Sequence, residues 1–245
     1  MRVVGVAGLP EVAEGTRIGE LVAEHARLAD GDVVVISQKV VSKAEGRVRR
    51  LSSVLPGGEA RRLGAALGKE PALVELILEE SKEVLRAERG VLIVETRHGF
   101  VCANAGIDSS NLPEPDTVCL LPEDPDASAR RIREEIRAAA GVTVAVIVSD
   151  SFGRAWRLGQ AEVAIGCAGI SPLDDWRGRN DTKGRKLEAT LIAVADEAAA
   201  AADLVRDKAS GIPVAIVRGL DRHISEDDGP GAAALRRPRS DDLFR

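Results

Sequence analysis

The 245-residue chain has no tyrosine, only three phenylalanines and two tryptophans. Proteins that recognise single-stranded nucleic acids stack bases on exposed aromatic side chains, which this chain scarcely has. Its 34 basic and 39 acidic residues give a net charge of −5, which disfavours binding to a phosphate backbone. We therefore expect no nucleic-acid partner.

Cysteine and histidine are also scarce, with three of each. No Cys-x-x-Cys pair occurs, and no histidine stands at a metal-type spacing from a cysteine. This excludes a zinc site of thiolate and imidazole ligands, so any metal ion must be a hard one held by oxygen. No apolar run approaches the roughly 20 residues of a membrane helix, and the N-terminus does not resemble a signal peptide. We expect a cytoplasmic protein with no membrane partner.

The common nucleotide and hydrolase motifs are missing. The chain has no Gly-x4-Gly-Lys-Ser/Thr loop, no Gly-x-Gly-x-x-Gly after a strand and no Gly-x-Ser-x-Gly elbow. Any nucleotide chemistry must therefore use other segments.

Hydrophobic periodicity predicts a mixture of helices and strands. The predicted helices are 16–30, 71–87, a helix that Asp126 caps and Gly141 ends, and 187–208; the predicted strands are 32–37, 90–95, 100–103, 117–121, 142–148 and 212–217. Strict βαβ alternation is absent and one connection is a hairpin, so we predict an α+β fold of mixed sheets with flanking helices. We expect residues 1–245 to form one domain with room for two lobes, and a loop-like tail from about residue 225.

Three polar segments are candidates for chemistry. In the first, Asp150 and Ser151 end the most hydrophobic strand and offer two oxygen ligands to a hard cation. Arg154 and Arg157 follow, and arginine suits phosphate or carboxylate oxygens. The alternative is an aspartate that caps a following helix, with arginines that face solvent.

The second segment, from Asn104 to Asn111, also follows a strand. Asp108 offers a further hard ligand, and Gly106 allows a ligand to approach the backbone. The alternative is a polar turn, since these residue types are common in turns. Two aspartates, each just after a strand, together favour one shared metal ion.

The third segment runs from Ser37 to Gly46 and carries Lys39 and Lys43, whose ammonium groups suit a phosphate. The alternative is a surface helix with solvated lysines. Residues 154–186 add seven basic against four acidic side chains, which indicates an anionic ligand unless these charges only aid solubility.

These segments resemble the coenzyme F420-0:L-glutamate ligase family, which adds glutamates to a deazaflavin cofactor. The resemblance covers nearly the whole chain and is carried by Gly8-Leu-Pro-Glu11 with Gly15, Gln38-Lys-Val-Val-Ser-Lys-Ala-Glu-Gly46, Asn104-Ala-Gly-Ile-Asp-Ser-Ser-Asn111, Asp150-Ser-Phe-Gly-Arg-Ala-Trp-Arg-Leu-Gly-Gln160, 193–208 and 213–219.

The resemblance implies a GTP-dependent ligase that uses Mg²⁺ or Mn²⁺ at two sites and is helped by K⁺. Its substrates would be coenzyme F420-0, L-glutamate and GTP. By resemblance, GTP contacts Leu9, Pro10, Glu11, Val12, Gln38, Lys43 and Asn111, while Asp108 and Asp150 hold one divalent ion and Ser151 a second. The family resemblance also implies an α+β fold peculiar to this family, and a homodimer whose groove holds the nucleotide.

The chemistry fits this expectation, because a carboxylate condenses with an amine only after activation, here as an acyl phosphate. Positioning and charge neutralisation then replace a protein nucleophile, with Arg154 or Arg157 at a γ-phosphate or substrate carboxylate. Two alternatives stay open at this point. The first is a metal-dependent nucleotide phosphohydrolase that uses the same aspartates, although no histidine that could act as its base lies near them in sequence. The second is a non-catalytic GTP-binding regulatory module, although such a module would need no basic residues for a second, anionic substrate.

Overall fold

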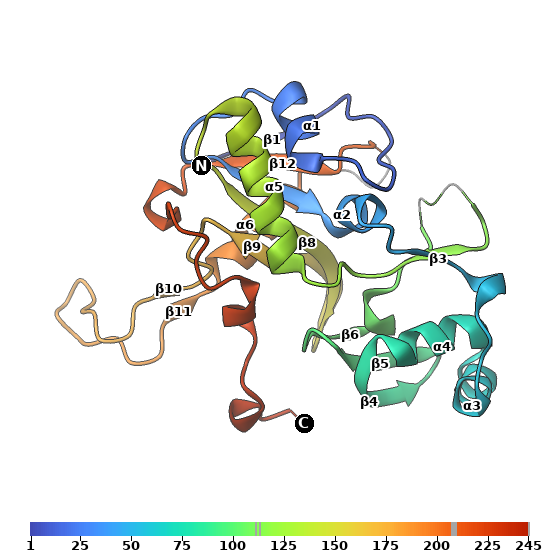
Figure 1. The fold of residues 1–245 in the computed structure, drawn as a ribbon. Coiled ribbons are helices and arrows are strands. Elements are labelled where there is room, and N and C mark those ends of the chain that lie inside the picture. The colour runs from blue at the N-terminus through green and yellow to red at the C-terminus, as the bar shows by residue number, and fades with distance from the viewer. Residues whose placement is uncertain (111, 113, 207–209, 245) are drawn as a thin grey trace.

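A five-stranded mixed sheet forms the larger body of the protein in the computed structural model, which describes residues 1–110, 112, 114–206 and 210–244 (Figure 1). In spatial order its strands are β1 (Arg2–Gly5), β12 (Val214–Arg218), β2 (Val33–Ser37), β8 (Ala145–Arg154) and β9 (Arg157–Ala168). β2 and β8 run parallel, and the other neighbouring pairs are antiparallel.

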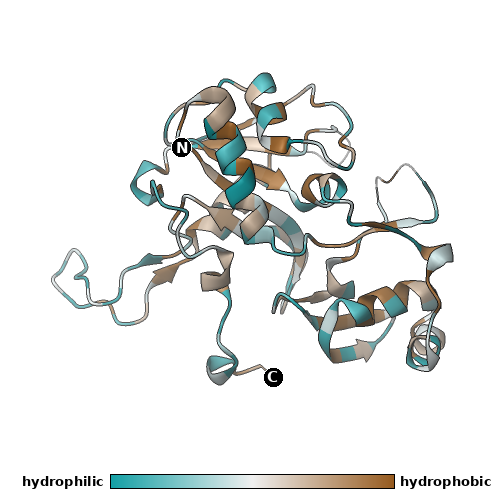
Figure 2. Ribbon diagram, viewed as in Figure 1, coloured by the Kyte–Doolittle hydropathy of each residue, from teal (hydrophilic) through white to brown (hydrophobic). Residues whose placement is uncertain are grey.

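Helices cover both faces of this sheet, as Figures 1 and 2 show. They are α1 (Ile18–His25) and α5 (Pro125–Ala140) on one face and α6 (Val194–Asp203) on the other. Side chains of a strand point alternately to its two faces. In β2, Val34 and Ile36 accordingly join the core under α1 and α5, whereas Val33 and Val35 join the core under α6.

The composition of α6 suits its close contact with the sheet. Four of its alanines, Ala195, Ala198, Ala199 and Ala202, are buried in that second core. Small side chains on the buried face let the helix lie near the β-branched residues of the strands, and alanine has the highest helix propensity.

A smaller body packs around a third core, at the lower right of Figure 1. It contains an antiparallel sheet of β4 (Ser81–Glu88), β5 (Val91–Thr96) and β6 (Val101–Ala103), and the helices α3 (Gly58–Leu67) and α4 (Pro71–Glu79). The short strands β3 (Val48–Arg50) and β7 (Thr117–Cys119) pair between the two bodies, and α2 (Gln38–Ala44) follows β2 directly. An arm carrying β10 (Asp174–Asp175) and β11 (Leu191–Ile192) projects from the opposite side.

The α+β fold with mixed sheets and flanking helices is confirmed, whereas several predicted boundaries are wrong. The helix predicted over 71–87 ends at Glu79, because 81–88 pair with β5 as a strand. The helix over 187–208 is confirmed only for Val194–Asp203.

The predicted cap of α5 is also wrong. Asp124, not Asp126, caps the helix by accepting a hydrogen bond from the backbone of Ala127. Asp126 instead accepts backbone hydrogen bonds from Cys167 and Ala232, and so ties α5 to β9 and to the C-terminal segment. At the other end Gly141 adopts the left-handed conformation of a C-cap, as expected.

The strand that holds Asp150 is longer than predicted. β8 continues through Asp150 and Ser151 to Arg154 and turns back into β9, so no helix follows for Asp150 to cap. No helix among the described residues is long and apolar enough to span a membrane.

Candidate active site

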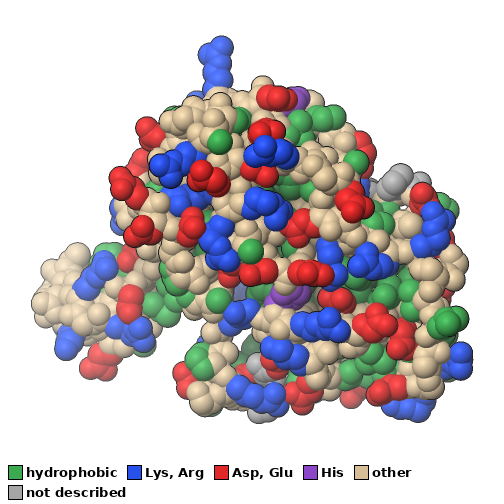
Figure 3. Space-filling model, in the orientation of Figure 1, with side chains coloured by type: hydrophobic (Ala, Val, Ile, Leu, Met, Phe, Trp, Pro, Cys, Tyr) green, Lys and Arg blue, Asp and Glu red, His purple; other side chains and the backbone are tan. Residues whose placement is uncertain are grey.

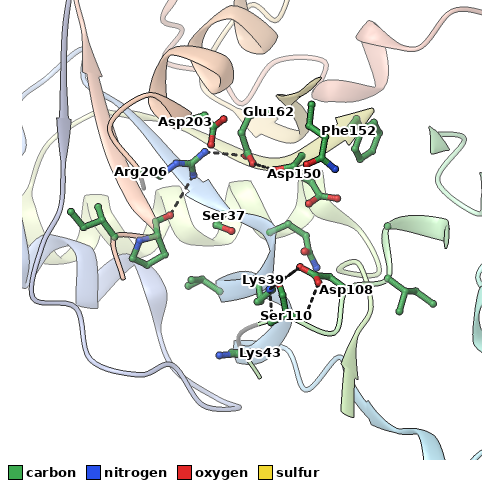
Figure 4. A pocket seen from close by; sticks show the side chains of 18 of the residues that line it. Ser37, Lys39, Lys43, Asp108, Ser110, Asp150, Phe152, Glu162, Asp203 and Arg206 are labelled. Carbon is green, nitrogen blue, oxygen red and sulfur yellow. Dashed lines mark hydrogen bonds and ion pairs between the residues drawn. The ribbon is translucent and has the colours of Figure 1, made fainter. Parts of the chain in front are cut away.

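A cavity of about 680 Å³ opens where the two bodies meet (Figure 4). Its size lies within the range of about 300–1,000 Å³ found for small-molecule sites. Its lining comes from 9–12, the junction of β2 and α2, the segment from β6 to Ser110, the paired strands β8 and β9, and the residues between α6 and β12. Segments far apart in sequence therefore meet at one place.

Asp108 lies on the cavity wall with its charge already balanced. Its Oδ2 is 2.8 Å from Lys39 Nζ, and its two oxygens also accept hydrogen bonds from the backbone and hydroxyl of Ser110. Partial burial of Asp108 opposes ionisation, but Lys39 and Ser110 outweigh it and lower the pKa of this carboxyl. The backbone of Asp108 is fixed by two hydrogen bonds with Cys119 in β7.

The backbone before Asp108 turns sharply. Asn104, Ala105 and Gly106 have φ of 53°, 54° and 70°, a conformation that L side chains rarely adopt. A Cβ at Gly106 would lie 2.9 Å from the Leu121 side chain. The need for glycine here comes from packing against Leu121 as well as from the backbone, and Gly106 still lines the cavity as expected.

Asp150 lies on the same cavity wall but in a different electrostatic environment. Burial, followed by the negative charges of Glu162 and Asp108, raises the pKa of Asp150 to about 7. No ion pair joins Asp150 to a cation within the part of the chain that the structure describes. A bound cation would favour the ionised form of a carboxylate in this environment.

Ser151 belongs to a second group of side chains in the cavity. Its hydroxyl donates a 2.6 Å hydrogen bond to Oε1 of Glu162, and the other oxygen of Glu162 accepts one from Arg206 at 3.0 Å. Ser151 and Glu162 face each other in the β8–β9 register, and Asp150 and Asp108 line the same cavity (Figure 4). The cavity thus presents several oxygen ligands, of which Asp108 and the Ser151–Glu162 pair already have partners within the protein.

These ligands fit hard divalent cations. No three His, Cys, Asp or Glu side chains among the described residues form a complete metal site by themselves. Mg²⁺ characteristically binds one or two carboxylates and completes its shell with water and substrate phosphates. The donor set of Asp108, Asp150 and Ser151 matches that chemistry.

Most residues expected to contact the nucleotide line the same cavity, namely Leu9, Pro10, Glu11, Val12, Gln38 and Lys43. The ammonium of Lys43 pairs with Glu11. The Gln38 amide is buried and donates hydrogen bonds to Ser42 Oγ and the backbone oxygen of Leu120, so it also holds α2 against the segment after β7. Asn111 lies outside the described residues.

The two arginines expected at the reacting groups lie elsewhere. Arg154 and Arg157 stand at the exposed end of the β8–β9 hairpin and are absent from the described lining of the cavity. Arg154 donates to the backbone oxygens of Leu158 and Gly159 at its own turn.

The basic segment further along also lies away from the cavity. Arg177 pairs with Asp175 and Arg179 with Asp174 at the base of the projecting arm. Figure 3 shows acidic and basic side chains interspersed over the arm and over the rest of this face. The local excess of positive charge is therefore partly balanced where it stands.

Sequence reasoning missed two charged side chains that line the cavity, Glu162 and Arg206. It named Lys39 as a candidate for a phosphate but did not foresee its ion pair with Asp108. Glu162 and Arg206 carry no local pattern, because their roles depend on strand pairing. Cys102 also lines the cavity, but burial and the charge of Asp150 raise its pKa to about 12, so it is a neutral thiol.

Comparison with known proteins gives one consistent result. The sequence profile of the family described as F420-0:Gamma-glutamyl ligase matches residues 7–219. The coenzyme F420:L-glutamate ligase of Methanothermobacter thermautotrophicus is 46% identical over 248 residues, which cover 99% of this chain and 98% of that protein. The enzymes of the same name from Haloarcula marismortui and Methanopyrus kandleri are 46% and 45% identical, over 100% and 96% of this chain and 96% and 94% of their own lengths.

Both the profile and the relatives extend over the segments that build the cavity, from the lining at 9–12 to Pro213. This chain is a member of the F420-0:gamma-glutamyl ligase family.

Proposed function

We propose that this protein is a GTP-dependent ligase that joins the amine of L-glutamate to coenzyme F420-0, and then adds further γ-linked glutamates. The observation that carries the proposal is the meeting of Asp108 and Asp150 with Lys39 and Lys43 in one cavity. This combination suits a triphosphate that must meet a second anion, since both signs of charge are offered at the same place.

The reaction divides into two displacements. A carboxylate oxygen of F420-0 attacks the γ-phosphorus of GTP, the bond from that phosphorus to the β–γ bridging oxygen breaks, and GDP leaves. The neutral amine of glutamate then attacks the acyl carbon, inorganic phosphate leaves, and the amine gives up a proton. Both steps depend on alignment and charge neutralisation rather than on a protein nucleophile, which fits a cavity whose thiol is protonated.

The protein supplies positions for these groups. Lys39 and Lys43 would neutralise phosphate oxygens, and Leu9 to Val12, Gln38 and Asn111 would hold the nucleotide. Asp108 and Asp150 would hold one Mg²⁺ or Mn²⁺ ion and Ser151 a second. When bound, such ions offset the charge of the triphosphate and the incoming carboxylate.

The family resemblance supplies three further features of the proposal, namely GTP as the nucleotide, the use of K⁺ and a homodimer. We also propose that residues 1–245 form one ligase domain, since no linker in the sequence marks a boundary. A role for Arg154 and Arg157 at a phosphate or carboxylate stays a prediction, since neither lines the cavity.

The test is incubation with F420-0, L-glutamate, GTP and Mn²⁺, followed by mass spectrometry. A product heavier by whole glutamyl units, with one GTP consumed per unit, supports the proposal. GTP consumption at the same rate without F420-0 and glutamate would instead indicate a phosphohydrolase. Binding of GTP with no consumption would indicate a regulatory module.

A further inference from the structure

Glu162 is buried on the cavity wall with both of its carboxylate oxygens in use. It faces Ser151 across the β8–β9 pair, and only 8% of its surface is exposed. Oε1 accepts a 2.6 Å hydrogen bond from the Ser151 hydroxyl, while Oε2 accepts one from the Arg206 guanidinium (Figure 4). The same guanidinium also donates to Ser149 Oγ at 3.1 Å.

The hydrogen bond to Glu162 determines whether the Ser151 hydroxyl acts as a donor or an acceptor toward the cavity. A serine hydroxyl has one proton and two acceptor lone pairs. Because the proton is directed at Glu162, the lone pairs alone remain for any other partner. A hydroxyl so held is an oxygen ligand for a cation, whereas one that turned its proton into the cavity would repel the cation.

Arg206 keeps Glu162 in the role of acceptor. A buried carboxylate beside Asp150 needs a counter-charge, and Arg206, which is 7% exposed, lies within hydrogen-bond distance. A charged pair of this kind is directional as well as strong. The contacts thus run from Arg206 to Glu162 to Ser151, and all three residues line the cavity.

We propose that Glu162 is a positioning residue that acts through Ser151, fixing its hydroxyl as an acceptor for a divalent cation, and that Arg206 holds Glu162 in place. The inference rests on the proposed function, because that function puts the second cation at Ser151. Partners that orient a metal ligand from behind typically contribute 10–100-fold to metal affinity.

Glu162→Gln is the informative substitution. Arg206 requires an acceptor, so the new amide would turn its oxygen to Arg206 and its NH₂ group to Ser151. The serine would then accept that hydrogen bond, and its proton would be free to point into the cavity. The volume of the side chain is almost unchanged.

The test titrates the full chain with Mn²⁺ and follows free Mn²⁺ by electron paramagnetic resonance, without turnover. Four proteins are compared with the unsubstituted one: Glu162→Gln, Ser151→Ala, the double variant, and Glu135→Gln. Glu135 is a matched control, because it is equally buried and accepts a 2.8 Å hydrogen bond from the backbone of Gly19, remote from the cavity.

We expect Glu162→Gln to weaken the Ser151-dependent Mn²⁺ site about tenfold, and the double variant to bind no more weakly than Ser151→Ala. Glu135→Gln should bind Mn²⁺ normally even if its melting temperature falls. Unchanged Mn²⁺ affinity in Glu162→Gln would overturn the inference, and so would additive losses in the double variant, which would make Glu162 an independent ligand.

Two further arms keep the outcomes separate. If Glu162→Gln does not fold, Glu162→Met combined with Arg206→Met replaces the pair by neutral groups that offer the Ser151 hydroxyl no acceptor, and it should show the same loss of Mn²⁺. If the unsubstituted protein binds no Mn²⁺, the proposed metal sites fail and this inference fails with them; if it binds Mn²⁺ and only the role of Glu162 is refuted, the proposed ligase function stands.

Discussion

The Lys39 ammonium lies 2.8 Å from Oδ2 of Asp108, so the protein itself supplies a counter-charge to one of the two aspartates of the cavity. Asp150 has no such partner among the described residues, and burial with the charges of Glu162 and Asp108 raises its pKa to about 7. Before a cation binds, Asp108 is therefore already paired with an ammonium group, whereas Asp150 is not paired with a cation among the described residues.

Lys39→Met should have opposite effects on two ligands. Removal of the ammonium takes a competing positive charge from Asp108, so Mn²⁺ alone should bind more tightly, while the KM for GTP should rise about tenfold or more. Lys43→Met is the control, because Lys43 pairs with Glu11 and not with Asp108. It should raise the KM for GTP and leave Mn²⁺ affinity unchanged. Weaker Mn²⁺ binding in Lys39→Met would contradict this account.

Asp150→Asn should abolish turnover without loss of folding. The substitution removes a ligand charge with little change of volume, and it abolishes the cost of ionising a partly buried carboxylate that has no cation partner among the described residues. We expect a melting temperature, measured without metal, no lower than that of the unsubstituted protein. Mass-spectrometric assay of glutamyl products gives the activity, and near-normal activity would remove Asp150 from the proposed metal site.

Gly106→Ala should destabilise the protein and disturb Asp108. Its φ of 70° strains any L residue, and its Cβ would meet Leu121 at 2.9 Å. Gly184→Ala is the matched control, since Gly184 has a φ of 78° with nothing near its Cβ position. Urea denaturation should show a larger loss for Gly106→Ala, by about 1–3 kcal/mol. Equal losses would show that Leu121 plays no part.

Asp196 gives a pH-dependent prediction away from the cavity. Burial raises its pKa above the usual value, although its carboxylate accepts a 2.9 Å hydrogen bond from the backbone of Ala164. A carboxyl whose pKa is raised in the folded state contributes stability below its pKa in the unfolded chain, which is about 4. This contribution is lost as the pH rises from that value through the raised pKa of the folded state.

We therefore expect Asp196→Asn to raise the melting temperature by a few degrees at pH 7 and to change it little at pH 4. The amide keeps the acceptor for Ala164. Glu197→Gln, an exposed change in the same helical turn, should not stabilise the protein at either pH. A gain at pH 4 as large as that at pH 7 would contradict the role assigned to burial.

Much of the larger body could be predicted from sequence because its strands are short β-branched runs. Residues 33–36 and 214–217 are examples, and each forms a buried strand. The error at 81–88 has a tertiary cause. Helical spacing continues there past Glu79, but pairing with β5 gives those residues a partner sheet, and local periodicity does not reveal that partner.

In the site, too, local sequence patterns revealed some residues, while others depend on contacts between distant segments. Asp108 and Asp150 could be predicted because each stands in a distinctive polar motif, and the structure brings both to one cavity. Glu162 could not, because it meets Ser151 only through the register of the β8–β9 hairpin. Arg154 and Arg157 show the converse, since a hairpin end separates them from the aspartate that precedes them closely in sequence.

Asp108 follows Ile107, which belongs to the third core, whereas Asp150 belongs to β8 in the central sheet, so the two carboxylates are anchored in different bodies. A cation bound by both would link the stabilities of these bodies. Calorimetric unfolding should then become sharper when Mn²⁺ is added, because the smaller sheet and the larger one would melt together rather than in succession.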